Sequence, residues 1–194
     1  MKSKSLKEIL VPAVMLFIIA AVCTALLAGT NLLTKDKIAE IAVQTAMEAK
    51  TSVFTEASSF SEEKKVDVDG EIIAYYEALD ETGSILGYVF STTTKSYGGD
   101  LSCMVGISCN TNKITGVKIT AINDTPGLGM KANSDDFLSQ YNNRSGEIGV
   151  NKNQVTDTEI KAISGATITS KAVTLNVNTA FKAYETVKAG GNNV

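Results

Sequence analysis

Two short stretches of the 194-residue sequence carry glycine, proline and hydroxyl side chains where a regular helix or strand would not. Residues 123–129 read Asn-Asp-Thr-Pro-Gly-Leu-Gly, and residues 164–170 read Ser-Gly-Ala-Thr-Ile-Thr-Ser. Proline fixes φ, and glycine permits positive φ and close approach of the backbone to a ligand. The first stretch can therefore lay bare amides against a flat ligand, although an ordinary tight loop would use the same residues.

The second stretch stands directly before a predicted helix. A helix N-terminus presents free N–H groups and a partial positive charge, so an anion near Thr167 or Thr169 would be stabilised there. Simple N-capping by Thr169 or Ser170 is the alternative. A third, weaker stretch, Tyr-Gly-Gly at 97–99, precedes a predicted strand and fits a plain loop as well.

Composition excludes several classes of function. The sequence has no histidine, which rules out Ser-His-Asp and Cys-His catalysis and removes the commonest zinc and haem ligand. We expect no catalytic residue and no metal site, so redox chemistry would need a borrowed cofactor. The net charge of -3 is dispersed and tryptophan is absent, so no nucleic acid partner is expected.

The three cysteines are too few for an ordinary four-thiolate iron–sulfur cluster within this chain. They are Cys23, Cys103 and Cys109. We expect Cys103 and Cys109 to be small buried hydrophobic residues, with a redox or ligand role as the alternative.

The elements that would position these residues begin with an apolar N-terminal segment. Residues 9–34 contain no charged side chain, and this uncharged segment is long enough to cross a bilayer. Lys2, Lys4 and Lys7 precede it, so the positive-inside rule predicts a cytoplasmic N-terminus, one span in the cell membrane and an extracytoplasmic remainder. A cleaved signal peptide, a lipoprotein signal at Cys23 and a pilin-type stalk are alternatives. The length of the apolar segment favours an uncleaved anchor, with Pro12 in its first helical turn.

The remainder is predicted to be an α+β fold, a twisted, mostly antiparallel sheet with packed helices. Alternating patterns predict strands at 71–78, 85–91, 101–109, 114–122 and 159–163. A short helix over 135–141 is predicted with Ser134 as its cap, and a longer helix from about Ser170 to Lys188. The predicted divisions are a cytoplasmic segment 1–8, a transmembrane helix 9–33, a helical stalk and linker 34–65, a folded domain 66–190 and a flexible tail 191–194.

The two glycine-containing stretches resemble the signatures of the FMN-binding domain family. Ser-Gly-Ala-Thr at 164–167 is similar to its flavinylation motif, in which a flavin transferase uses FAD to esterify FMN to the threonine, here Thr167. Thr-Pro-Gly-Leu-Gly at 125–129 matches the segment thought to lie along the isoalloxazine. The resemblance implies covalent FMN, with Lys131 and Lys171 offsetting the phosphate charge. The implied cofactor-binding residues are Thr167, Ser164, Gly165, Ala166, Thr169, Thr125, Pro126, Gly127, Leu128, Gly129, Tyr97, Gly98, Lys131 and Lys171.

The order of anchor, Tyr-Gly-Gly, hairpin and both motifs resembles the G subunits of Rnf electron-transport complexes over nearly the whole chain. This implies an electron-carrying subunit, not a catalyst alone, whose partners are the other membrane subunits of a complex that transfers electrons between ferredoxin and NAD and translocates sodium ions or protons. Two positions depart from the family: Lys161 stands where an acidic residue is usual, and Asp124 where Glu is common.

Three other functions remain open at this point. The related C-type component of the sodium-translocating NADH:quinone reductase would carry the same flavin, as would a flavinylated domain that serves another membrane-bound reductase. A cofactor-free structural membrane subunit would use both glycine stretches only to shape its fold. Co-purifying partners separate the first two from an Rnf subunit, and an intact complex without flavin would favour the third.

Overall fold

The computed structural model describes residues 2–190, apart from the side chains of residues 2–7 and 39. The predicted tail 191–194 and the side chains of Lys2, Lys4 and Lys7 lie outside the described residues. The chain forms two compact units, residues 1–44 and residues 45–194. The second unit thus begins earlier than the predicted domain start at residue 66, because the end of the first helix packs into it.

Helix α1 spans Lys2–Val53. The first unit contains most of this helix, and its last residues, 45–53, belong to the second unit. From Glu8 onward it is long and apolar enough to cross a membrane. Its large apolar side chains are exposed, as with Phe17 at 74% and Leu27 at 72%. Because α1 begins well ahead of Pro12, that proline lies inside the helix and not in the predicted first turn.

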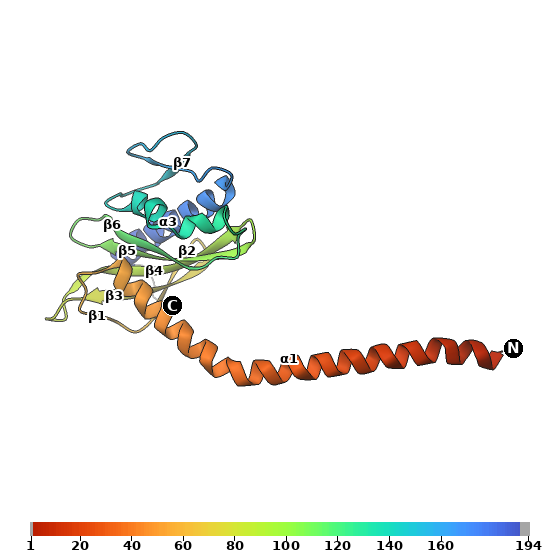
Figure 1. Cartoon of the computed structure of the whole chain (residues 1–194). Coiled ribbons are helices and arrows are strands. Elements are labelled where there is room, and N and C mark those ends of the chain that lie inside the picture. The colour runs from red at the N-terminus through yellow and green to blue at the C-terminus, as the bar shows by residue number, and fades with distance from the viewer. Residues whose placement is uncertain (1, 191–194) are drawn as a thin grey trace. The chain divides into compact units, whose positions relative to one another are not determined.

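A curled antiparallel sheet forms the centre of the second unit (Figure 1). Its strands β3 (Glu71–Leu79), β4 (Ile85–Ser96), β5 (Gly99–Ser108) and β6 (Ile114–Ala121) pair in chain order. The sequence predicted all four, but β4 extends five residues past its predicted end at 91. The extension is polar, and it is held because Thr92 and Thr94 donate hydrogen bonds to the carbonyls of Asn176 and Ala172. The predicted α+β fold is confirmed.

Two strands were not predicted at the other edge of β3. Strands β1 (Ser59–Phe60) and β2 (Lys64–Val68) both pair with β3. Strand β1 lies within the predicted linker 34–65, and β2 spans the end of that linker and the start of the predicted domain. In β2 the two valines, Val66 and Val68, are buried between exposed charged residues. A separate parallel pair joins β7 (Gly149–Asn151) to β8 (Glu159–Lys161). The sequence had predicted only the second of these, with an end at 163.

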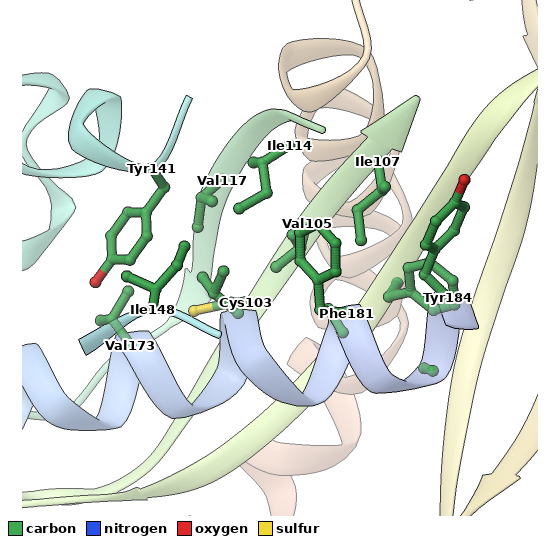
Figure 2. Packing of buried hydrophobic residues seen from close by; sticks show 14 of the residues in the cluster. Cys103, Val105, Ile107, Ile114, Val117, Tyr141, Ile148, Val173, Phe181 and Tyr184 are labelled. Carbon is green, nitrogen blue, oxygen red and sulfur yellow. The ribbon is translucent and has the colours of Figure 1, made fainter. Parts of the chain in front are cut away.

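Helix α3 (Thr167–Lys188) covers one face of the sheet and begins three residues earlier than predicted. Figure 2 shows Val105 and Ile107 of β5 against Phe181 and Tyr184 of the helix. The predicted apolar stripe of α3 is buried at each position: Val173, Val177, Ala180, Phe181 and Tyr184.

Short helices fill the remaining length between β6 and β7. They are η1 (Gly129–Asn133), α2 (Asp135–Leu138) and η2 (Ser139–Tyr141). Ser134 occupies the N-cap position of α2, but its side chain makes no capping hydrogen bond, so that part of the prediction is wrong.

The opposite face of the sheet receives the end of α1 on three glycines from adjacent strands, the glycine patch Gly87, Gly106 and Gly116. A Cβ on Gly106 would lie 2.6 Å from the carbonyl oxygen of Val53, and one on Gly87 would lie 2.5 Å from the Phe54 ring. Phe54 and Val53 are buried there with Val89 and Met104. Neighbouring residues along β4 and β5 therefore serve two different cores.

Candidate functional site

A cavity of about 620 Å³ opens where three segments meet. They are the turn between β4 and β5, the loop that follows β6 and the first turn of α3. Its lining contains parts of all three glycine stretches that the sequence singled out: Tyr97, Asp124, Thr125, Leu128, Gly129, Gly165, Ala166, Thr167, Ile168 and Thr169.

The two motif loops contact each other because glycine stands at the point of approach. Gly127 has φ +76° and Gly165 has φ +80°, values that glycine adopts without strain. A Cβ on Gly165 would lie only 3.3 Å from Cδ2 of Leu128. The interpretation of these stretches as backbone-exposing loops fits this geometry.

Asp124 connects the three segments through its carboxylate. One oxygen, Oδ2, accepts hydrogen bonds from the hydroxyls of Ser96 and Thr169, both at 2.5 Å, and Oδ1 accepts from the backbone N–H of Gly98 at 2.6 Å. The residue is only 3% exposed. Burial opposes its ionisation, but the hydrogen bonds from Ser96, Thr169 and Gly98 together outweigh burial and lower the pKa of the Asp124 carboxyl. The site therefore contains a buried negative charge.

The N-terminus of α3 has free hydrogen-bond donors. The N-cap residue, Ala166, makes no side-chain capping bond, and within residues 2–190 no acceptor faces the N–H groups of Thr167, Ile168 and Thr169. N-capping by Thr169 or Ser170, the alternative reading of the sequence, is therefore wrong. Together with the helix dipole these amides form an anion-binding site on the cavity wall.

Three hydroxyl groups stand at the start of α3, and two are already engaged. Thr169 donates to Asp124, while Ser170 donates to the carbonyl of Ala166 and accepts from the N–H of Ile163. Thr167 is half-buried on the cavity wall, and its hydroxyl has no hydrogen-bond partner in the described part of the chain. Of these three hydroxyls, only that of Thr167 is without a partner among the described residues.

The cavity has the surfaces that FMN requires. Tyr97, Leu128 and Ile168 supply apolar walls and are 73%, 45% and 58% exposed, so a flat ring could cover them. Gly129 lets the loop at 125–129 pack against Asp124, since a Cβ there would lie 2.5 Å from Cβ of Asp124. Free amides at the α3 N-terminus suit a phosphate. The residues present thus fit the phosphate and the ring of a flavin nucleotide.

Some residues that the resemblance implied lie away from the cavity lining. Lys131 borders a separate hollow with Phe137 and Ile163, and Lys171 borders another with Val150. Gly98 is not part of the cavity lining, and its N–H donates a hydrogen bond to Asp124. Ser164, Pro126 and Gly127 are exposed beside the lining residues.

Sequence reasoning missed three residues at the site. Asp124 had been noted only as a departure from the family pattern, although its place directly before Thr-Pro-Gly-Leu-Gly was a usable signal. Ile168, between two threonines, could have been proposed from the same motif. Ser96 gave no signal, because a serine at the end of a strand has no distinctive spacing.

The cysteines lie away from the cavity. Cys103 is fully buried, and burial raises the pKa of its thiol to about 12. Cys109 is half-buried, and burial raises its thiol pKa as well. The expectation of a buried hydrophobic role holds fully for Cys103 and in part for Cys109.

Two family models match the chain. The FMN-binding domain matches residues 96–182, which contain all three cavity segments, and the RnfG N-terminal region matches residues 1–53, the whole of α1. Both matches follow the division into an N-terminal helix and a folded domain.

Two relatives match most of the chain, and both are G subunits of ion-translocating complexes. One belongs to the Na⁺-translocating ferredoxin:NAD⁺ oxidoreductase complex of Acetobacterium woodii and is 36% identical over 88% of this chain and 88% of its own. Another belongs to the ion-translocating oxidoreductase complex of Methanosarcina acetivorans and is 32% identical over 86% of this chain and 89% of its own.

Among solved structures, the C-type component of the Na⁺-translocating NADH-quinone reductase from Parabacteroides distasonis shares the fold with a TM-score of 0.56. It is 19% identical and is matched over 69% of this chain and 80% of its own. At that identity the likeness concerns the fold alone.

Proposed function

Because the chain belongs to the family of G subunits of Rnf-type ion-translocating oxidoreductase complexes, we propose that it carries electrons within such a complex on FMN. The Acetobacterium woodii relative is a subunit of a Na⁺-translocating ferredoxin:NAD⁺ oxidoreductase complex. The apolar helix and this kinship identify the chain as a membrane protein. In this role the chain supplies the protein environment for the flavin, and the flavin carries the electrons.

The FMN is attached covalently to Thr167. The observation that carries this proposal is the free Thr167 hydroxyl on the cavity wall, beside Thr169 and Ser170, whose hydroxyls are engaged. In the attachment step, Oγ of Thr167 bonds to the FMN phosphorus of FAD, and the phosphoanhydride bond to AMP breaks. AMP leaves, and the hydroxyl proton passes to a base of the flavin transferase. No electron changes hands in this step.

The residues around Thr167 would hold the phosphate and the ring in different ways. The free N–H groups of Thr167, Ile168 and Thr169 stabilise the phosphate charge through hydrogen bonds and the helix dipole. The loop at 125–129 and the exposed ring of Tyr97 provide the walls against which the isoalloxazine packs. Bound FMN supplies the redox chemistry, and this chain positions it.

The partners are the other membrane subunits of the complex and, during maturation, a flavin transferase. The chain crosses the membrane once through α1, with its N-terminus in the cytoplasm and the FMN-binding domain outside, because Lys2, Lys4 and Lys7 precede the apolar segment. Covalent attachment suits that location, since an extracytoplasmic protein has no supply from which to replace a lost flavin.

The test is co-expression of the full chain with a flavin transferase, followed by intact-mass measurement and in-gel flavin fluorescence. The wild type should gain the mass of FMN less one water. Thr167→Ala should gain nothing, and Thr167→Ser should keep some adduct because it retains a hydroxyl. Thr186→Ala, which removes a hydroxyl at the other end of the same helix, is the matched control and should load normally.

Two results would contradict the proposal. An unloaded wild type, with the transferase active on a control substrate, would favour the cofactor-free structural subunit. An adduct that persists in Thr167→Ala would place the ester on another residue. Purification of the native complex separates the remaining alternatives, because an Rnf-type subunit should co-purify with ferredoxin:NAD oxidoreductase activity and not with NADH:quinone reductase activity.

A further inference from the structure

One residue outside the predicted set of cofactor-binding residues holds the cavity together. Asp124 lies at the junction of three segments that are distant in sequence. Its carboxylate accepts from Ser96, 28 positions earlier, and from Thr169, 45 positions later, as well as from the Gly98 amide. Hydrogen bonds to a charged group are stronger than those between neutral groups, so the three together can fix the position of each segment.

The packing around Asp124 is as restrictive as its hydrogen bonds. A Cβ on Gly98 would lie 2.9 Å from Cα of Asp124, and one on Gly129 would lie 2.5 Å from its Cβ and 2.8 Å from Oγ1 of Thr169. Both glycines therefore let backbone close around the carboxylate. Asp124 is only 3% exposed, so its carboxylate relies on these protein hydrogen bonds more than on water.

From this geometry we propose that Asp124 is a positioning residue that selects Thr167 as the flavin attachment site and sets the electrostatic environment of the flavin. The inference rests on the proposed function and deepens it. By engaging the Thr169 hydroxyl, Asp124 fixes the first turn of α3 and leaves the Thr167 hydroxyl free on the cavity wall. It acts through Thr169, Ser96 and Gly98 and forms no bond to the phosphate.

The same carboxylate would influence the flavin by its charge. Asp124 lines the cavity, so a flavin bound there lies beside a buried negative charge. A negative charge disfavours the addition of electrons to a neighbouring ring, and in a buried site it is screened only weakly. The wild-type flavin should therefore have a lower midpoint potential than the flavin of a variant that is neutral at this position.

The experiment compares Asp124→Ala and Asp124→Asn with the wild type, all as full-length chains in detergent. Alanine removes every contact of the carboxylate. Asparagine keeps its shape, and the hydroxyls of Ser96 and Thr169 can turn to accept from the new amide, so the contacts largely survive while the charge is lost. The initial rate of flavinylation at Thr167 is followed by peptide mass mapping with purified transferase and FAD, and the midpoint potential by spectroelectrochemistry.

We expect Asp124→Ala to slow attachment at Thr167 by on the order of 100-fold, the effect of moving a reacting group by about 1 Å. Asp124→Asn should attach flavin faster than Asp124→Ala, and its potential should shift upward from that of the wild type. A purely structural role would leave that potential unchanged once the flavin is attached.

Three outcomes are decisive. Attachment to Asp124→Ala at the wild-type rate would overturn the positioning role, and a potential in Asp124→Asn equal to that of the wild type would overturn the electrostatic role. If Asp124→Ala does not fold, Thr169→Val, which removes the hydroxyl that Asp124 engages, decides the positioning role by its flavinylation rate, and Asp124→Asn decides the electrostatic role by its potential. A wild type that takes up no flavin would instead contradict the proposed function itself.

Discussion

Glycine brings backbone close to another segment in two regions of the folded domain, with different consequences. In the glycine patch, Gly87, Gly106 and Gly116 make room for Val53 and Phe54, which are apolar and buried. At the cavity, Gly98 and Gly129 make room for Asp124, a charged residue at the edge of an open site. The patch therefore contributes chiefly to stability, and the glycines at the cavity chiefly to the position of functional groups.

The largest expected effect tests the patch side of this comparison. Phe54 is 1% exposed and packs on the sheet face opposite α3, so Phe54→Ala should lower the free energy of unfolding by ~3–5 kcal/mol. Thermal or denaturant unfolding of the detergent-solubilised chain measures it. The folded fraction should load flavin as the wild type does. A loading defect in that fraction would show that the two regions are not separable.

Gly106→Ala should have the next largest effect on stability. The new Cβ would lie 2.6 Å from the Val53 carbonyl oxygen and would also overlap Oγ1 of Thr115, so overpacking should cost ~1–3 kcal/mol. Gly149→Ala is the control, because its Cβ would meet only the side chain of Glu159, at 3.1 Å. Equal unfolding midpoints for the two variants would argue against a packing role for the patch.

Gly129→Ala makes the corresponding change at the cavity and should affect flavin loading more than stability. The exposed loop at 125–128 can move outward to relieve the contact with Asp124, so we expect an unfolding cost of about 1 kcal/mol. The movement takes the loop away from α3 and should slow flavinylation roughly tenfold or more. Gly149→Ala, whose added Cβ would meet only the Glu159 side chain away from the cavity, is the control. Normal flavin loading of Gly129→Ala would contradict the view that the glycines at the cavity position its functional groups.

Lowering the pH should affect the cavity and not the glycine patch, because the cavity contains the buried carboxylate of Asp124 and the residues packed on the patch are apolar. The pKa of Asp124 is lowered in the fold, so its contribution to stability is complete above its unfolded pKa of about 3.9 and is lost as the pH falls through the lower folded pKa. The stability difference between the wild type and Asp124→Asn should therefore shrink below about pH 4. Phe54→Ala should keep a constant difference from the wild type over that range.

The smallest effect on stability is expected for Lys161→Glu. Lys161 is exposed, and its hydrogen bonds to Gln140 are made by its backbone, whose N–H donates to Oε1 and whose carbonyl accepts from Nε2, so the substitution should change the free energy of unfolding by less than about 0.5 kcal/mol. Flavinylation should become faster, since the related family carries an acidic residue here. Lys152→Glu, a charge reversal at another exposed lysine, is the control. Equal acceleration by both variants would indicate a general charge effect.

Sequence patterns predicted the parts of the fold in which apolar residues recur at regular spacing and are buried in the core. Alternation marked the long strands, and the apolar spacing of Val173, Val177 and Phe181 marked the buried stripe of α3. Strand β2 was missed because Lys64, Lys65 and Asp67 leave only two apolar residues, Val66 and Val68, to show the alternation. The signal was present but short.

The start of α3 was missed for a different reason. Thr167, Ile168 and Thr169 are β-branched and have low helix propensity, so local preference argued for a later start. Two tertiary hydrogen bonds outweigh that preference, one from Thr169 to Asp124 and one from the Ile163 amide to Ser170. Contacts between segments so far apart in sequence leave no local pattern, which is also why the role of Asp124 was not predicted.

The position of Thr167 as the first residue of α3 determines how much slack a tethered group would have. The helix is 22 residues long and buried along one side, so its first residue moves with the whole domain. A β-branched side chain in a helix has few χ1 rotamers, and only one bond separates Cα from the carbon that bears the hydroxyl. A flavin esterified there would swing from a fixed pivot. Its reach toward neighbouring electron carriers would then depend on its own ribityl chain, not on any movement of a protein loop.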